Sequence, residues 1–155
     1  MNASSSWNSR LAELGITLPP VAAPLAAYVP AVRTGNLVYT AGQLPLDAGK
    51  LAGTGKVGAE VSPERGKAMA RLCALNALAA VDSLVGLDAV IRVVKVVGFV
   101  ASAPGFNGQP GVINGASDLL YEVFGESGAH ARSAVGVSEL PLDAPVEVEL
   151  IVEVG

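Results

Sequence analysis

Residues 146–154 of the chain read Val-Glu-Val-Glu-Leu-Ile-Val-Glu-Val. The even positions of this stretch are all apolar, and the odd positions hold Glu147, Glu149, Ile151 and Glu153. Because successive side chains of a strand point to opposite faces of a sheet, the alternation predicts a strand with one face packed on helices. The other face is expected to meet something polar.

Further strands are predicted upstream of this one. Residues 131–137 are expected to form the preceding strand, and the β-branched run 89–100 a central strand covered on both sides. Residues 28–33 and 37–40 flank Thr34-Gly35-Asn36. Glycine and asparagine tolerate the positive φ of a tight turn, so these two segments predict a β-hairpin.

Helices are predicted between the strands. The clearest one begins at Ser62-Pro63-Glu64, which offers a capping hydroxyl, a proline where no intrahelical N–H is needed and an acid near the positive end of the helix dipole. Gly86 is its natural end. Residues 114–124 predict a second helix, and residues 7–18 predict a short one that stops at Pro19-Pro20.

The order of elements is therefore β-β-α-β-α-β-β after an N-terminal helix. It indicates an α+β fold with a mainly antiparallel sheet and two helices on one face. Residues 1–20 are expected to form a helical extension, and residues 21–155 a single domain, because 155 residues suit one folding unit.

The composition indicates which classes of partner the chain can bind. Hydrophobic residues make up 51% and charged residues 15%, so some apolar surface is expected to lie in a subunit interface. The net charge of −4 leaves no basic stripe for nucleic acid. No apolar stretch reaches the roughly 18 residues of a membrane span, and the first residues do not resemble a signal peptide. We therefore expect no membrane partner and a cytoplasmic location.

Several familiar site patterns are missing from the sequence. There is no Gly-rich phosphate loop, no Gly-x-Ser-x-Gly elbow and no pair of Cys or His ligands, so neither a metal nor an organic cofactor is expected. Cys73 lies in a helical pattern and is predicted to serve packing. His130 is the only histidine and is expected to be a solvated loop residue rather than a catalytic base.

Arg132 and Glu147 are the residues most suited to chemistry. Arg132 opens the strand 131–137, and its same-face neighbours Ala134 and Gly136 leave room for a ligand. A planar guanidinium there suits a carboxylate held by two parallel hydrogen bonds. Hairpin pairing of the last two strands would place Arg132 opposite Glu147, so the alternative is a salt bridge that joins these strands.

The chain resembles the RidA/YjgF family, the reactive-intermediate deaminases also known as L-PSP endoribonucleases. The likeness runs from about residue 28 to the C-terminus. It is carried by Tyr28, by Gly35-Asn36-Leu37-Val38-Tyr39-Thr40-Ala41-Gly42-Gln43-Leu44-Pro45-Leu46, by Val93-Val94-Lys95, by Ala131-Arg132-Ser133-Ala134-Val135, and by Leu140-Pro141 with Val146-Glu147-Val148-Glu149.

This resemblance implies a chorismate-mutase-like fold, a homotrimer and sites in the clefts between subunits. It implies that Arg132 holds a substrate carboxylate, with Ser133 beside it, and that Glu147 directs water onto an imine carbon. Tyr28 would line the same cleft, and backbone groups near Gly42 would orient the ligand.

Two positions depart from the family pattern. Many relatives have a cysteine where this chain has Ala134. A family asparagine on the second helix aligns with Ser117 or Asp118, while Asn114 lies about one turn earlier. The N-terminal helix and the loop 103–111 resemble a longer branch of the family.

Three functions follow from the resemblance. The first is hydrolysis of 2-imino or enamine acids to 2-keto acids and ammonia, which needs a positioned water, a carboxylate and an arginine but no cofactor. The second is a trimer that binds small carboxylates without turnover. The third, an endoribonuclease, conflicts with the acidic balance of the chain.

Overall fold

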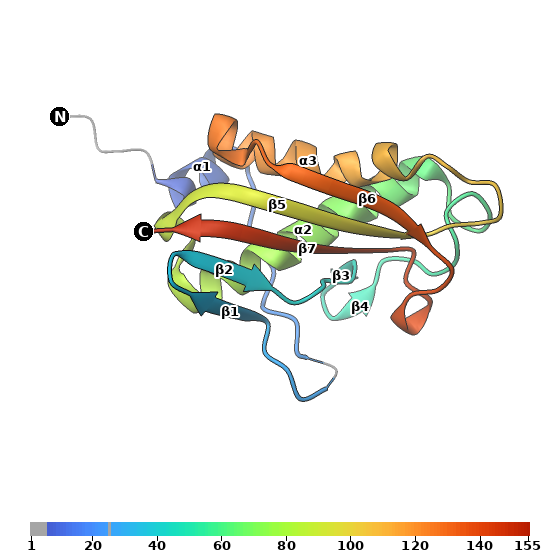
Figure 1. Cartoon of the computed structure of the whole chain (residues 1–155), viewed down its shortest axis with the longest axis horizontal. Helices are drawn as coiled ribbons and strands as arrows, with labels where there is room; N and C mark the ends of the chain where they lie inside the picture. The colour runs from blue at the N-terminus through green and yellow to red at the C-terminus, as the bar shows by residue number, and fades with distance from the viewer. Residues whose placement is uncertain (1–5, 25) are drawn as a thin grey trace.

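The computed structural model describes residues 6–24 and 26–155 and forms two layers, a sheet and the helices that cover one of its faces (Figure 1). Residues 1–5 of the expected extension lie outside the described part. The main sheet has the strand order β1-β2-β7-β5-β6. Its strands are β1 (Ala31–Thr34), β2 (Leu37–Thr40), β5 (Val90–Ala101), β6 (Ala131–Val137) and β7 (Val146–Val154). The helices are α1 (Trp7–Glu13), α2 (Pro63–Val85) and α3 (Gln109–Phe124), with short 3-10 turns η1 (Leu87–Ala89), η2 (Gly125–Gly128) and η3 (Pro141–Asp143). A separate small hairpin is formed by β3 (Leu46–Asp47) and β4 (Lys50–Leu51).

The last two strands do not pair with each other. β6 runs parallel to β5, with Arg132 beside Val96, whereas β7 runs antiparallel to β5, with Glu147 beside Phe99. The expected hairpin pairing of these strands is therefore wrong. The reason is that α3 carries the chain back along β5, so β6 enters the sheet as the second strand of a β-α-β crossover.

Local signals predicted the other strands and the long helix well. β1 and β2 pair antiparallel around Gly35, which has φ +56°, so the first hairpin is confirmed. The hydroxyl of Ser62 accepts a hydrogen bond from the Arg65 N–H at 3.2 Å, and Gly86 ends α2 with φ +80°. Both ends of α2 are therefore confirmed.

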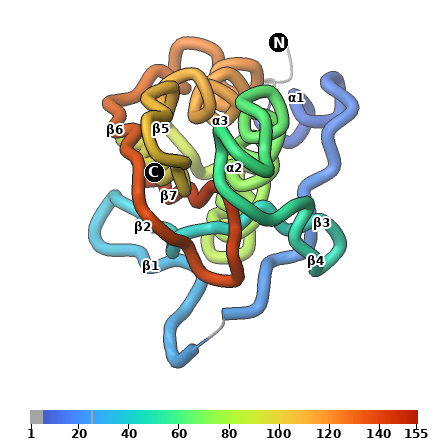
Figure 2. The backbone as a smooth tube through the Cα atoms, turned by 90° about the vertical axis from the view of Figure 1, so that its right-hand side faces the viewer, coloured from blue at the N-terminus to red at the C-terminus, as the bar shows by residue number. Residues whose placement is uncertain are grey.

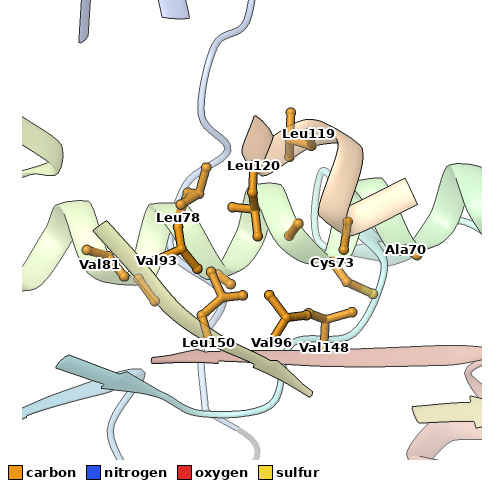
Figure 3. Close-up of a cluster of buried hydrophobic side chains, with 14 of the residues drawn as sticks. Ala70, Cys73, Leu78, Val81, Val93, Val96, Leu119, Leu120, Val148 and Leu150 are labelled. Carbon is orange, nitrogen blue, oxygen red and sulfur yellow. The ribbon is translucent and has the colours of Figure 1, made fainter. Parts of the chain in front are cut away.

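The core lies between the sheet and the two long helices, as Figure 3 shows. The even positions of β7 face the helices and are buried, and the odd positions are partly exposed, as the alternation predicts. Cys73 is fully buried in this core, so its packing role is confirmed. The side chains that meet here come from α2, α3, β5 and β7, and include Cys73, Leu78, Val81, Leu119, Leu120, Val93, Val96, Val148 and Leu150.

Within the described residues, α2 is the one helix long and apolar enough to cross a membrane by length and composition, with a mean hydropathy of 1.5. It makes its main contacts with α3 and β7. More than half of its apolar window is buried inside the fold, which is the arrangement of a core helix.

The second long helix begins earlier than the sequence indicates. α3 starts at Gln109 and ends at Phe124, before Gly125. Pro110 is tolerated because the N–H groups of the first turn have no intrahelical acceptor, so the missing N–H of proline costs nothing there. Its Ile113 packs directly onto β5 at Gly98, where an added Cβ would lie 2.5 Å from Ile113 Cδ1. Gly98 therefore permits close packing of helix on sheet.

The N-terminal helix is shorter than predicted. It ends at Glu13, because Gly15 takes φ +69° and breaks the helix before Pro19. Trp7 donates its indole N–H to the Val90 carbonyl at 2.7 Å, and its ring meets Phe124 edge to face at 5.0 Å. α1 is thus attached to the domain at the end of α3 and η1.

The second face of the sheet carries no helix (Figure 1). We call it the open face. By the strand register, Phe99, Glu147, Ile151, Tyr39 and Val32 belong to this face. Val135, beside Phe99 on β6, joins them and is 45% exposed. The open face is therefore mixed: apolar side chains surround the glutamates of its central strand, and Lys95 lies beside Ile151.

Candidate active site

Glu147 lies against Gly42. Gly42 follows β2, and the next residue, Gln43, pairs through its backbone with Val148 at 2.8 and 3.0 Å. This pairing brings the backbone of Gly42 next to the Glu147 side chain. A Cβ built on Gly42 would overlap the carboxylate Oε1 and would lie 2.9 Å from its Cδ. A side chain at position 42 would therefore force the Glu147 carboxylate out of this position.

The surroundings of Glu147 favour its neutral form. Burial raises the pKa of the Glu147 carboxyl above its ordinary value, and the charge of Glu149 raises it further. Among the described residues, no cation forms an ion pair with Glu147. A carboxylate with a raised pKa and no counter-ion is well suited to accept a proton from water.

A surface hollow extends from Glu147 to Tyr28. It is lined by Val32, by residues 39–42, by Glu147 and by residues 27–29 of the lead-in, as we call the segment between α1 and β1. Tyr28 is 46% exposed here. The structure therefore brings three of the sequence-predicted site residues together, namely Tyr28, Gly42 and Glu147.

Arg132 is held in place by α3. Its Nη1 donates to Asn114 Oδ1 at 2.8 Å and to Ser117 Oγ at 3.1 Å. Within the described residues, its Nε and Nη2 have no acceptor. The free side of the guanidinium therefore retains the paired N–H groups that bind a carboxylate with two parallel bonds.

The hydrogen bonds of Ser117 continue to His130. The Gly128 carbonyl can only accept, so His130 carries its proton on Nδ1, and Nε2 is then the acceptor for the Ser117 hydroxyl at 2.9 Å. The Nδ1–H of His130 then donates to the Gly128 carbonyl at 2.6 Å. His130 is thus half-buried and bonded at both ring nitrogens, and the expectation of a solvated loop residue is wrong.

The structure resolves which residues of α3 serve the arginine. Asn114 and Ser117 are three residues apart and share one helix face, so both reach Arg132, and this spacing is the signal that could have identified them as a pair. Asp118 points elsewhere and pairs with Lys67 at 3.6 Å.

Arg132 and Glu147 do not meet within one chain. They lie on β6 and β7 with β5 between them, and Arg132 faces α3 whereas Glu147 belongs to the open face. The salt bridge weighed from the sequence is therefore absent from the described residues. Ser133 alternates with Arg132 along β6, so its side chain points to the open face, away from the guanidinium.

Neither a metal site nor a reactive thiol is found near these residues in the described part of the chain. Residues 6–24 and 26–155 contain no cluster of three or more His, Cys, Asp or Glu side chains that could hold a metal ion. Burial raises the pKa of the Cys73 thiol well above its ordinary value, and the Glu147 charge adds to this effect. The thiol therefore stays protonated and unreactive.

Comparisons with known proteins agree with this architecture. The family model described as "YjgF/chorismate mutase-like, putative endoribonuclease" matches residues 8–154. Protein TCP17 of Trypanosoma cruzi is 46% identical over 155 residues, which cover 99% of this chain and 97% of that protein. The crystal structure of Atu1372 from Agrobacterium tumefaciens has a TM-score of 0.88 and 48% identity, over 96% of this chain and 92% of that one.

A third relative has a name that describes an activity. The 2-iminobutanoate/2-iminopropanoate deaminase of Dermatophagoides farinae is 33% identical over 137 residues, which cover 88% of this chain and 93% of that protein. Together with the match over residues 8–154, these likenesses cover nearly the whole chain. The chain belongs to the YjgF/RidA family and has its chorismate-mutase-like α+β fold.

Proposed function

We propose that the protein hydrolyses reactive 2-imino and enamine acids to 2-keto acids and ammonia, at a site shared by neighbouring copies of a homotrimer. The name of the Dermatophagoides farinae relative supports this reaction class. The proposed substrate is a small carboxylate metabolite, and the reaction uses no metal or organic cofactor.

One observation carries the proposal: within residues 6–24 and 26–155, Arg132 has no acidic partner and Glu147 has no basic one. Arg132 is oriented by the neutral Asn114 and Ser117 and keeps two N–H groups on its free side. Glu147 is partly buried beside Gly42 without a cation. Leaving such groups half-satisfied costs stability, so their arrangement favours a ligand-binding role.

The trimer brings these two half-sites together. The open face carries no helix and exposes the apolar side chains of Val32, Tyr39 and Val135, and burying them against another copy would remove them from water. Closed rotational symmetry places the β6 edge of one copy beside a different surface of the next. In the proposed seam, Arg132 of one copy and Glu147 of its neighbour flank one substrate, with Tyr28 closing the cleft.

The reaction then needs only positioning and one proton carrier. Arg132 binds the substrate carboxylate and fixes the imine carbon near Glu147. Glu147 accepts a proton from water as the water oxygen bonds to that carbon, giving a carbinolamine. That proton then passes from Glu147 to the nitrogen. As the C–N bond breaks, the hydroxyl group gives its proton to Glu147 and the C=O bond forms, so a 2-keto acid and ammonia leave. The raised pKa of Glu147 suits both transfers.

The direct test generates imino acids in situ with an amino-acid oxidase and follows the loss of imine and the release of ammonia. The protein is expected to accelerate both, and Glu147→Gln to remove the acceleration. Binding of 2-keto acids without any acceleration would replace the enzyme with a carboxylate-binding trimer. Cleavage of RNA by the purified protein that Arg132→Ala abolishes would instead favour the endoribonuclease.

A mixing experiment tests the shared site separately. Arg132→Ala and Glu147→Gln chains are each expected to be inactive. When the two are unfolded together and refolded, random assembly should restore about a quarter of the sites, because each site needs one intact residue from each of two neighbours. Failure to restore any activity in verified mixed trimers would contradict the shared site, even if the wild type is active.

A further inference from the structure

A second cavity adjoins the candidate site on the helix side of the chain. It has a volume of about 440 Å³ and lies between lead-in residues 19–24, the β3–β4 hairpin and α2. Figure 2 shows the lead-in passing beside β3 and β4. Cavities of about 300–1,000 Å³ are typical of sites for small molecules. The size alone therefore permits a substrate side chain.

The two hollows share two wall residues beside the candidate catalytic centre. Tyr28 and Gly42 line both the 440 Å³ cavity and the hollow that contains Glu147. Gly42 is also the residue against which the Glu147 carboxylate packs. The cavity is therefore the neighbouring space, bounded by Tyr28 and Gly42, for the side chain of a substrate whose imine carbon lies beside Glu147.

The walls of the cavity are apolar and uncharged. Among the described residues, its lining includes no Asp, Glu, Lys, Arg or His. Most of the wall comes from proline, alanine, valine, leucine and glycine, including Ala22 of the lead-in and Leu142 of η3. A charged side chain would lose its hydration here without gaining a counter-ion, and this transfer is strongly unfavourable.

Two buried amides give the cavity its polar character. Asn76 is 2% exposed, and its Nδ2 donates to the carbonyls of Leu46 and Leu72, both at 3.0 Å. Gln43 is 6% exposed, and its Nε2 donates to the Ala41 carbonyl at 3.2 Å.

The oxygens of these amides remain available. Within the described residues, neither Asn76 Oδ1 nor Gln43 Oε1 accepts a hydrogen bond from the protein. Both oxygens remain accessible to solvent. Both residues line the cavity. The cavity therefore offers hydrogen-bond acceptors and no cation, an arrangement that repels a carboxylate and tolerates an N–H or O–H group.

We propose that this cavity is the side-chain pocket of the enzyme and selects imino acids with an uncharged, chiefly apolar side chain larger than a methyl group. Branched aliphatic and aromatic side chains belong to this class, and acidic ones are excluded. The inference rests on the proposed function for the position of the imine carbon. It makes the lead-in, which precedes the hairpin of the fold, a specificity element.

The test compares substrates that share the imine and carboxylate groups and differ only in their side chain. Imines are generated from alanine, leucine, phenylalanine and glutamate, and kcat/KM is measured for each. The wild type is expected to favour the leucine and phenylalanine imines over the alanine and glutamate imines by about tenfold or more, since contacts of a few methylenes discriminate at this level. Equal values, or a preference for glutamate, would overturn the pocket.

Substitutions in the wall of the cavity test directly whether it holds the substrate side chain. Ala22→Phe, or the smaller Ala22→Leu if the former does not fold, fills the cavity and should lower the ratio of phenylalanine to alanine kcat/KM by about tenfold. Ala59→Phe places the same side chain on an exposed turn outside the cavity and should leave this ratio unchanged. An unchanged ratio in a folded Ala22 variant would also overturn the pocket.

Binding measurements keep the inference separate from the proposed reaction. If no imine is hydrolysed, the reaction fails, but calorimetry with 4-methyl-2-oxopentanoate, pyruvate and 2-oxoglutarate still tests the pocket. Tighter binding of 4-methyl-2-oxopentanoate that Ala22→Phe weakens would support it. Equal binding of the three acids, or no binding of any, would overturn it.

Discussion

The Cα of Gly42 and the carboxylate of Glu147 occupy adjoining space, so that even one methyl group on Gly42 would overlap Glu147 Oε1. The contact arises because Gln43 and Val148 pair through their backbones at the end of β2. The position of the candidate base is thus set by a residue that has no side chain.

Gly42→Ala is expected to displace the Glu147 side chain. Because the overlapping atoms are the end of a flexible side chain, which can rotate away, the unfolding free energy should change little while turnover falls. The measurement is denaturant unfolding together with imine hydrolysis. Gly111→Ala is the matched control, because a Cβ at Gly111 meets nothing within 4 Å, and it should leave stability equal or slightly raised. Wild-type turnover in Gly42→Ala would refute the seating role.

Arg132→Lys is expected to weaken the binding of a small 2-keto acid by roughly 10–100-fold, the range of a lost charge-assisted hydrogen bond. Lysine keeps the charge but lacks the planar pair of N–H groups. Ser117→Ala should have a smaller effect in the same direction, because Asn114 still holds the guanidinium. Calorimetric titration checks both variants, and an unchanged affinity in Arg132→Lys would argue against carboxylate binding there.

Glu149→Gln is expected to move the acid limb of the pH profile of kcat/KM to lower pH. The charge of Glu149 raises the pKa of Glu147, so its removal lowers that pKa and lets the basic form persist in more acidic solution. Glu153→Gln, farther along the same strand, is the control and should shift the profile less. A shift toward higher pH would contradict the assignment of Glu147 as the base.

Glu147→Gln separates catalysis from structure. Turnover should fall by roughly 10²–10⁴-fold, as for a lost general base, while 2-keto acid binding survives. Because burial raises the pKa of Glu147, the stability that this group contributes is fully present below its unfolded pKa and is lost as pH rises through the folded one. The variant should therefore melt higher than the wild type at about pH 8, with a smaller difference at about pH 4.

The opposite change in the melting temperature of Glu147→Gln would point to a different environment of this residue. A lower melting temperature of Glu147→Gln at neutral pH would mean that a cation lies directly beside Glu147 in the assembled protein. Full activity with reduced stability would refute the catalytic assignment.

Val135→Glu is expected to break the trimer. It places a charge on the exposed apolar part of the open face, which the proposed assembly buries. Light scattering should show monomers, and turnover should be lost because Arg132 and Glu147 no longer meet. Tyr121→Glu, on an exposed position of α3, is the control and should remain a trimer. A monomeric wild type would refute the proposed assembly outright.

The sequence by itself determined the secondary structure closely. The alternation of residues 146–154, the Ser62 cap of α2 and the Gly35 turn were each readable because they depend on residues next to one another in the chain. The end of α1 and the start of α3 were displaced by a few residues, since Gly15 and Pro110 act through backbone conformation that neighbouring patterns do not reveal.

Only the tertiary structure decided how the site residues lie. The α3 crossover inserts β5 between β6 and β7, and so separates Arg132 from Glu147 within one chain. The choice of Asn114 and Ser117 as partners of Arg132, and of Gly42 as the seat of Glu147, depends on which distant segments meet. Strand order and helix docking follow from burial of the whole core, a sum over long-range contacts that no local pattern encodes.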